Sequence, residues 1–223
     1  MISASICLGY FKFDYICSIK DNRMNNSVLI LKSAFLSGIC IGLAGFGFLA
    51  EKNIVGAVCF SFGLLAVVSY GLKLYTGTAG FFKKGEFGQL LLILVGNILG
   101  CFAVSLIARC SGMPLQETAQ GVLEGRLSLG PLRGAVLAMG CGFIMTTVVT
   151  FARKGNNWPL LFGIPLFINC GFPHCVADAF YYLCVPFGFL ADNLVEVLVF
   201  YLSIVVGNFI GCNAYRFIMN KES

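Results

Sequence analysis

The only histidine of the chain, His174, lies inside a long apolar run, where an ionisable side chain is costly to place. It directly follows Gly171, Phe172 and Pro173, and glycine with proline in the middle of a run predicts an interrupted helix. Histidine changes charge near neutral pH, so such a residue suits a polar path that handles protons. A neutral histidine that bridges two helices is the alternative. The residue types alone leave both interpretations open.

A second group of polar residues interrupts an earlier apolar run between Ser69 and Gly80. Thr76 and Thr78 supply hydroxyl groups there, among several glycines. Non-helical backbone at membrane depth persists only where protein or water satisfies its polar groups. Both breaks are therefore predicted to line a cavity.

Two lysines stand near these runs. Lys32 lies at the start of the first apolar run, where a lysine either extends to the membrane surface or raises the local concentration of anions. Lys73 lies beside the Thr76 break, where it could face a path or pair with Asp178.

The eleven cysteines form no Cys-x-x-Cys motif, and most lie inside apolar runs. Those inside the runs are Cys40, Cys59, Cys101, Cys141, Cys184 and Cys212, which we interpret as small apolar packing residues. A membrane thiol oxidoreductase would need a cysteine pair or a quinone site, and neither is found. The sequence predicts no catalytic residue, no metal ligand and no cofactor.

The composition is typical of a membrane protein with several spans. Hydrophobic residues make up 58% of the 223 residues and charged residues 11%, with a mean hydropathy of +0.89. Because a spanning helix takes ~20 apolar residues, we predict six spans. They are 28–50, 54–82, 87–108, 131–152, 158–189 and 193–218, the second and fifth interrupted. The polar stretch 110–130 is too short to fold as a separate soluble domain.

The basic residues indicate the topology. The net charge of +5 comes from residues scattered over the loops, which does not predict nucleic-acid binding. The positive-inside rule favours both termini in the cytoplasm. Residues 1–27 are then a cytoplasmic segment and 219–223 a cytoplasmic tail. The start of the chain lacks the continuous apolar core of a signal peptide, and Met24 is an alternative start.

One phrase occurs twice. Val-Gly-Asn-Ile-Leu-Gly-Cys at 95–101 returns as Val-Gly-Asn-Phe-Ile-Gly-Cys at 206–212. The glycines Gly96, Gly100, Gly207 and Gly211 allow close helix packing, and Asn97 and Asn208 can hydrogen-bond across it. Such glycine pairs occur in any helical bundle, but two in matching contexts indicate a repeat. Three spans per half make that repeat inverted, 28–108 and 131–218, within one channel domain 28–218.

Several motifs together resemble the formate/nitrite transporter family. Phe60-Ser61-Phe62-Gly63-Leu64, followed by Lys73-Leu74-Tyr75-Thr76-Gly77, resembles the family's second span and loop. The segment from Gly171 to Asp178 resembles the signature Gly-Phe-Glu-His-Ser-x-Ala-Asn. The Gly-Asn-x-x-Gly phrases also fit, so the resemblance covers about residues 28–218.

The resemblance implies an aquaporin-like helical fold in a homopentamer in the lipid bilayer of a bacterial cytoplasmic membrane, with one pore per protomer. Such pores pass small monovalent weak-acid anions: formate, nitrite, hydrosulfide and lactate. By position it implies one constriction at Phe60 and Phe167, another at Leu64, Leu74, Tyr75 and Met145, a central His174 with Thr76 as its partner, and an anion-attracting Lys32.

The chain departs from the family pattern at several positions. In the signature, Pro173 stands in place of Glu and Asp178 in place of Asn. Gly142 stands where the fourth span commonly has Asn, and Tyr75 stands where Phe is usual. The lysine expected early in the fifth span is not aligned, and Asn156 falls there. These departures keep the pore pattern but leave the substrate open.

Apolar constrictions exclude a hydrated ion, because a bare charge at the bilayer centre is penalised and a neutral acid is much less so. Together with the resemblance, this predicts a channel for formate, nitrite or hydrosulfide with proton-linked permeation. The alternative is an aquaporin-like pore for small neutral solutes, disfavoured because paired Asn-Pro-Ala boxes are absent. A structural or receptor-like protein would have no need of broken spans.

Overall fold

The computed structural model describes residues 26–81, 83 and 85–219, and the regular structure within these ranges is helical. The predictions about the chain before Asn26, including the alternative start at Met24, lie outside the described residues. The tail beyond Met219 lies outside them too.

The first half of the chain contains three long helices and one short helix. These are α2 (Asn26–Glu51), α3 (Ile54–Ser69), α4 (Tyr75–Ala79) and α5 (Phe87–Arg109). The second span is interrupted as predicted, because α3 ends at Ser69 and α4 begins at Tyr75. Gly71 lies in this break with φ of 64°, a left-handed conformation that favours glycine.

The second half repeats this order with one further helix. Its elements are α6 (Leu115–Arg153), α7 (Trp158–Asn169), α8 (Cys175–Cys184), α9 (Phe187–Asp192) and α10 (Leu194–Met219). The fifth span is also interrupted, between α7 and α8, and Gly171 has φ of 67° there. The matching conformations of Gly71 and Gly171 indicate that the two breaks are built alike.

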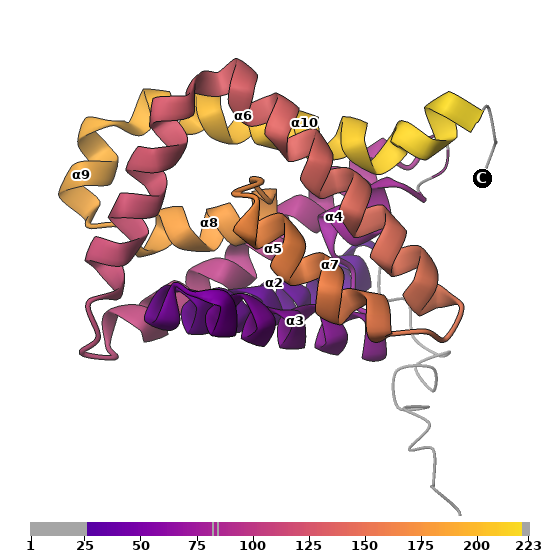
Figure 1. Ribbon diagram of the computed structural model, residues 1–223, viewed down its shortest axis with the longest axis horizontal. Coiled ribbons are helices and arrows are strands. Elements are labelled where there is room, and N and C mark those ends of the chain that lie inside the picture. The colour runs from indigo at the N-terminus through magenta and orange to yellow at the C-terminus, as the bar shows by residue number, and fades with distance from the viewer. Residues whose placement is uncertain (1–25, 82, 84, 220–223) are drawn as a thin grey trace, which may run out of the picture.

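The helices form an all-helical membrane fold. In the described part of the chain, α2, α5, α6 and α10 are long and apolar enough to cross a bilayer. Helix α2 packs against α5 and α3, whereas α6 packs against α10. Figure 1 shows α4, α7 and α8 between these two groups. The interrupted spans therefore meet in the middle of the molecule.

The doubled phrase lies where the long helices touch most closely. A Cβ atom on Gly100 of α5 would overlap the backbone oxygen of Phe35 in α2. A Cβ atom on Gly211 of α10 would overlap the backbone oxygen of Met139 in α6. The other two glycines, Gly96 and Gly207, likewise face the residues Ala34 and Ala135 of those partner helices. The absence of a side chain lets each pair of backbones come into contact.

The stretch 110–130 differs from the sequence expectation of a polar connection, because it is helical from Leu115 onward. Leu115, Ala119 and Leu123 are buried at four-residue spacing, so this first part of α6 has an apolar face. Helix α6 bends at Gly130, which has φ of 72° and is followed by Pro131. The bend places the polar first part of α6 over one end of the interrupted spans (Figure 1).

Candidate functional site

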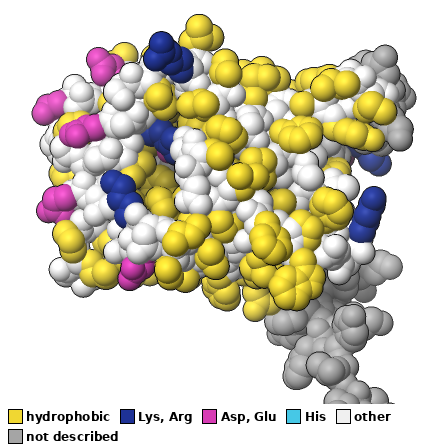
Figure 2. Space-filling model, in the orientation of Figure 1, with side chains coloured by type: hydrophobic (Ala, Val, Ile, Leu, Met, Phe, Trp, Pro, Cys, Tyr) yellow, Lys and Arg dark blue, Asp and Glu magenta, His cyan; other side chains and the backbone are white. Residues whose placement is uncertain are grey.

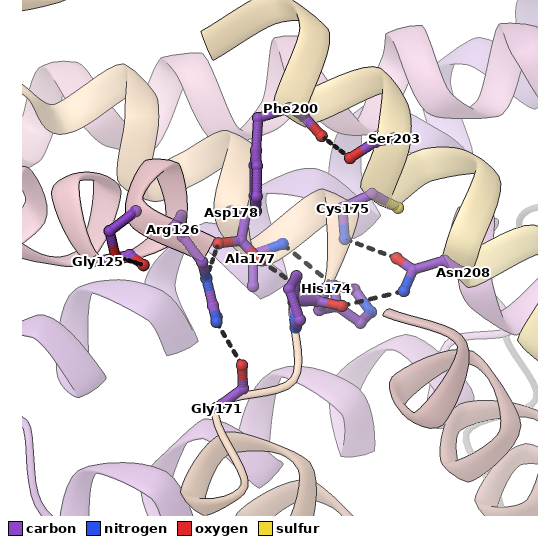
Figure 3. Close-up of polar contacts among 12 residues, drawn as sticks. Gly125, Arg126, Gly171, His174, Cys175, Ala177, Asp178, Phe200, Ser203 and Asn208 are labelled. Carbon is purple, nitrogen blue, oxygen red and sulfur yellow. Dashed lines mark hydrogen bonds and ion pairs between the residues drawn. The ribbon is translucent and has the colours of Figure 1, made fainter. Parts of the chain in front are cut away.

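His174 begins helix α8 and caps its N-terminus. Its Nδ1 atom accepts the backbone N–H of Ala177 at 3.1 Å. Its own backbone N–H donates to Asp178 Oδ2 at 2.7 Å, and the Asp178 N–H donates back to the His174 carbonyl at 2.8 Å. This reciprocal arrangement resembles a capping box and satisfies backbone donors at the helix start (Figure 3). The imidazole ring therefore has a fixed orientation.

The ring joins the two halves of the molecule through Thr76 of α4. The Thr76 Oγ1 and His174 Nε2 atoms are 2.8 Å apart, and both side chains are buried. Because Nδ1 accepts from a backbone N–H, it carries no proton, and the neutral ring must carry its proton on Nε2. The Nε2–H group then donates to Thr76 Oγ1. The hydroxyl hydrogen of Thr76 is left to donate elsewhere.

Asn97 and Asn208 hold the two breaks in equivalent ways. Asn97 Oδ1 accepts the Tyr75 N–H at 2.9 Å, and its Nδ2 donates to the carbonyls of Lys73 at 2.9 Å and Ala34 at 2.8 Å. Asn97 thus supplies a hydrogen-bond acceptor to a backbone N–H at the start of α4, which has no partner within the helix.

In the other half, Asn208 Oδ1 accepts the Cys175 N–H at 2.8 Å. Its Nδ2 donates to the carbonyls of Pro173 at 3.0 Å and Ala138 at 2.9 Å. Figure 3 shows Asn208 reaching toward His174 and Cys175 from α10. The asparagines of the doubled phrase therefore tie α4 and α8 to the long helices.

The cysteines that end the doubled phrase connect each half to the break of the other. Cys101 Sγ lies 3.4 Å from the carbonyl oxygen of Val176 in α8, and Cys212 Sγ lies 3.4 Å from that of Thr76 in α4. Both thiols are buried. Among the described residues, no group of three or more His, Cys, Asp or Glu side chains could hold a metal ion.

Phe60 and Phe167 are brought together beside the histidine. Their ring centroids are 6.3 Å apart in an edge-to-face arrangement, and both rings are buried. The Phe167 ring also stacks on the His174 imidazole, with centroids 5.6 Å apart and planes 24° apart. The two rings predicted to form one constriction therefore lie directly beside the Thr76–His174 pair.

Leu64, Leu74, Tyr75 and Met145, the residues predicted for the second constriction, are all buried. Leu64 and Leu74 line a cavity of about 200 Å³ that also contains Arg153. Tyr75 and Met145 are not among its lining residues. The Tyr75 hydroxyl instead lies 3.4 Å from the Val205 carbonyl oxygen of α10.

A larger cavity of about 420 Å³ lies toward the opposite end of the molecule. Its lining includes Lys52, Arg126, Phe167, His174 and Asp178. It reaches the Phe167 ring from the end of the molecule covered by the first part of α6. The two cavities approach the Thr76–His174 pair from opposite sides. Lys32 is exposed on α2 and lines neither of them.

Arg126 also lies beside His174, although the sequence indicated it only as one of the basic residues scattered over the loops. Its Nε atom lies 2.9 Å from Asp178 Oδ1, and its Nη1 donates to the Gly171 carbonyl (Figure 3). The ion pair that Asp178 forms is therefore with Arg126, and the pairing with Lys73 is wrong. A signal was present, since Arg126 follows Leu123 by three residues and shares the buried face of that helix.

Comparison with known proteins gives consistent matches. A family model described as formate/nitrite transporter matches residues 18–219. The formate channel FocB of Escherichia coli is 25% identical over 158 residues, covering 62% of this chain and 55% of that protein. The uncharacterized transporter YrhG of Bacillus subtilis is 26% identical over 149 residues, covering 58% of this chain and 56% of that protein. The chain thus spans about half the length of the curated relatives it matches.

Solved structures with the same fold extend over nearly the whole chain. A pentameric formate channel with formate bound superposes with a TM-score of 0.75 at 19% identity, covering 87% of this chain and 96% of the other. An FNT family ion channel superposes with a TM-score of 0.76 at 18% identity, covering 89% and 92%. These likenesses establish the fold.

Proposed function

The chain belongs to the formate/nitrite transporter family, and from this premise we propose that it is a membrane channel for a small monovalent weak-acid anion: formate, nitrite or hydrosulfide. The observation that carries the proposal is the contact between Thr76 and His174. These two polar groups lie between apolar constrictions, and a cavity approaches them from each end. A polar centre with apolar approaches suits a solute that must lose its water and its charge.

Permeation is proposed to be proton-linked. An anion that enters the Phe60–Phe167 constriction leaves water for a largely apolar wall, where its charge is strongly disfavoured. A proton from water at the entry side converts the anion to the neutral acid, and the acid releases this proton to water at the exit. One proton therefore accompanies each anion.

His174 is proposed to orient a hydrogen bond and not to give up a proton. Its Nδ1 is occupied by the Ala177 N–H, so protonating this nitrogen would break the helix cap. Its Nε2–H group donates to Thr76, which directs the Thr76 hydroxyl hydrogen toward a passing solute. That donor would bind an oxygen atom of formate or nitrite, or the sulfur atom of hydrosulfide, at the pore centre.

Fixed cations at the mouths are proposed to concentrate the anion. Lys52 lines the larger cavity, which also contains the Arg126–Asp178 ion pair. At the other end Lys32 adjoins Ser33, whose hydroxyl accepts the Lys73 N–H at 3.0 Å. We propose that Lys32 contributes to the positive potential of that mouth.

The proposed assembly is a homopentamer in the cytoplasmic membrane, with both termini in the cytoplasm. The pentamer is supported by a structural relative that is a pentameric formate channel. Figure 2 shows acidic side chains gathered at the end of the molecule away from the C-terminal part of α10, and this is the end proposed to face outward. Large hydrophobic side chains are exposed along α6 and α10, including Leu132, Val136, Val199 and Leu202. Lipid or a neighbouring subunit would cover such a surface.

Uptake into liposomes tests the proposal. Purified wild-type protein and His174→Ala are compared for uptake of formate, nitrite and hydrosulfide, with protein-free liposomes as the background. We expect saturable uptake of at least one of the three by the wild type and a large loss in the variant. Equal uptake by the two proteins would contradict the central role of His174. Uptake of all three solutes at the rate of protein-free liposomes would contradict the channel function.

A further inference from the structure

Lys73 and Arg153 lie together at the mouth opposite Arg126. Both line the cavity of about 200 Å³ that ends at Leu64 and Leu74, and both line a neighbouring cavity of about 270 Å³ nearer the helix ends. Thr78 is the third residue common to the two cavities. These three residues therefore stand where the two cavities adjoin, directly before the Leu64–Leu74 constriction.

The two cations are held in place by the surrounding structure. The Arg153 guanidinium carbon lies 3.6 Å from the centre of the Phe81 ring, a stacking arrangement that leaves the N–H edges available. The Lys73 backbone is fixed at both ends, because its N–H donates to Ser33 Oγ and its carbonyl accepts from Asn97 Nδ2. The Lys73 side chain is exposed to the mouth.

No carboxylate within the described ranges forms an ion pair with either cation; the ion pair found there joins Arg126 and Asp178. The carboxylate that lines the wider cavity belongs to Glu86, whose Oε2 accepts the Lys83 N–H at 2.8 Å. Two like charges at one junction repel each other, and an anion between them removes that repulsion. Of the residues that the structure describes, Lys73 and Arg153 line the cavity of about 200 Å³ and no acidic residue does, and a cleft lined by one sign of charge attracts the opposite sign.

We propose that Lys73, Arg153 and Thr78 form an anion-binding site that loads the weak-acid anion from this mouth. The proposal rests on the channel function above and deepens it by naming the residues that act at one entrance. The guanidinium and ammonium groups donate to the anion, and the Thr78 hydroxyl supplies a third donor. In the proposed topology this mouth faces the cytoplasm.

Exposed cations near a membrane can also act on lipid headgroups, and Lys154 distinguishes the two roles. Lys154 directly follows Arg153 and is exposed at the same end of α6. It lines a different cavity, with Thr147 and Phe151, that contains neither Lys73 nor Arg153. Removing the Lys154 charge therefore changes the charge of this end of the protein but not the junction before the constriction.

The test measures initial formate flux separately from each face, in right-side-out and inverted membrane vesicles with no formate on the opposite side. We expect Lys73→Gln and Arg153→Gln each to raise the half-saturating formate concentration at the cytoplasmic face about fivefold, the effect of about 1 kcal/mol. The value at the outer face is expected to stay the same. Lys154→Gln is expected to match the wild type at both faces, and the charge-preserving Lys73→Arg is expected to raise the half-saturating concentration less than Lys73→Gln does.

Salt provides a second measurement of the same site. Raising ionic strength is expected to weaken formate binding at the cytoplasmic face of the wild type, and much less that of the Lys73→Gln/Arg153→Gln double variant. Equal changes at both faces, or an effect of Lys154→Gln as large as that of Arg153→Gln, would overturn the site. If the wild type transports while both single variants match it, only this site is wrong. If the wild type carries none of the three anions, the channel function is wrong as well.

Discussion

The Thr76 hydroxyl oxygen lies 2.8 Å from the Nε2 atom of His174, where the short helices α4 and α8 meet. Helix α4 belongs to the first interrupted span and α8 to the second, so this contact joins the two halves of the chain. The ring nitrogen on the other side is occupied by the Ala177 N–H at 3.1 Å. The contact therefore has a defined direction, from the histidine N–H to the threonine oxygen.

Replacing the Thr76 hydroxyl tests that direction. Thr76→Val keeps the shape of the side chain but leaves the buried His174 Nε2–H without an acceptor and removes the donor proposed for the substrate. We expect formate flux to fall roughly 10- to 100-fold, corresponding to the loss of about 1–3 kcal/mol. Thr76→Ser retains the hydroxyl and is expected to keep most of the flux. Similar flux in Thr76→Val and Thr76→Ser liposomes would show that the hydroxyl has no role.

The Arg126–Asp178 ion pair predicts a non-additive effect on stability. Arg126→Gln leaves the buried Asp178 carboxylate without its cation, which costs about 3–5 kcal/mol for a buried pair. The double variant Arg126→Gln/Asp178→Asn removes both charges, so we expect it to recover much of this loss. Thermal unfolding in detergent measures all four proteins, including Asp178→Asn. A double variant whose loss of stability equals the sum of the losses in the two single variants would mean that the two residues are not coupled.

Asn97 and Asn208 are expected to be equally important, because each makes three hydrogen bonds of the same kind to a break and a long helix. Asn97→Leu and Asn208→Leu each leave buried backbone groups without partners, at about 1–3 kcal/mol for each group. We predict similar falls in melting temperature for the two variants. Asn193→Leu, at an α9 end with one side-chain bond to the Phe189 carbonyl, is the control and should have a smaller effect. A large difference between the two buried sites would contradict the equivalence of the halves.

The sequence was sufficient to predict the interrupted spans of the fold. The glycines and hydroxyls near Thr76 and the Gly-Phe-Pro-His segment predicted both interruptions, because such residues destabilise a continuous apolar helix. The first part of α6 was not predicted, because a polar stretch between two apolar runs is typical of a connection. The four-residue spacing of Leu115, Ala119 and Leu123 was the available signal.

Other features depend on tertiary contacts that no local pattern contains. The edge-to-face contact of Phe60 and Phe167 joins helices from opposite halves, and 22 phenylalanines in the chain offer many alternatives. The partner of Asp178 depends on the bend at Gly130, which brings Arg126 over the break. An ion pair with Asp178 was one of two interpretations of Lys73, and it fails because the two residues line cavities at opposite ends of the molecule.

The proposed permeation of a neutral acid predicts how flux responds to pH and voltage. If one proton crosses with each anion, no net charge moves, so a potassium gradient with valinomycin should leave formate uptake unchanged. A more acidic outer solution should increase uptake, because it raises the driving force for the proton that accompanies formate. Both effects are measured in liposomes with a pH-sensitive dye inside and radiolabelled formate outside, with Phe167→Ala as the comparison. Removing that ring widens the passage between Phe60 and Phe167 beside His174, so the variant should admit the hydrated anion and become voltage-sensitive. Wild-type uptake that follows the membrane potential and ignores the pH gradient would show that the bare anion crosses, and that the constriction does not require a neutral solute.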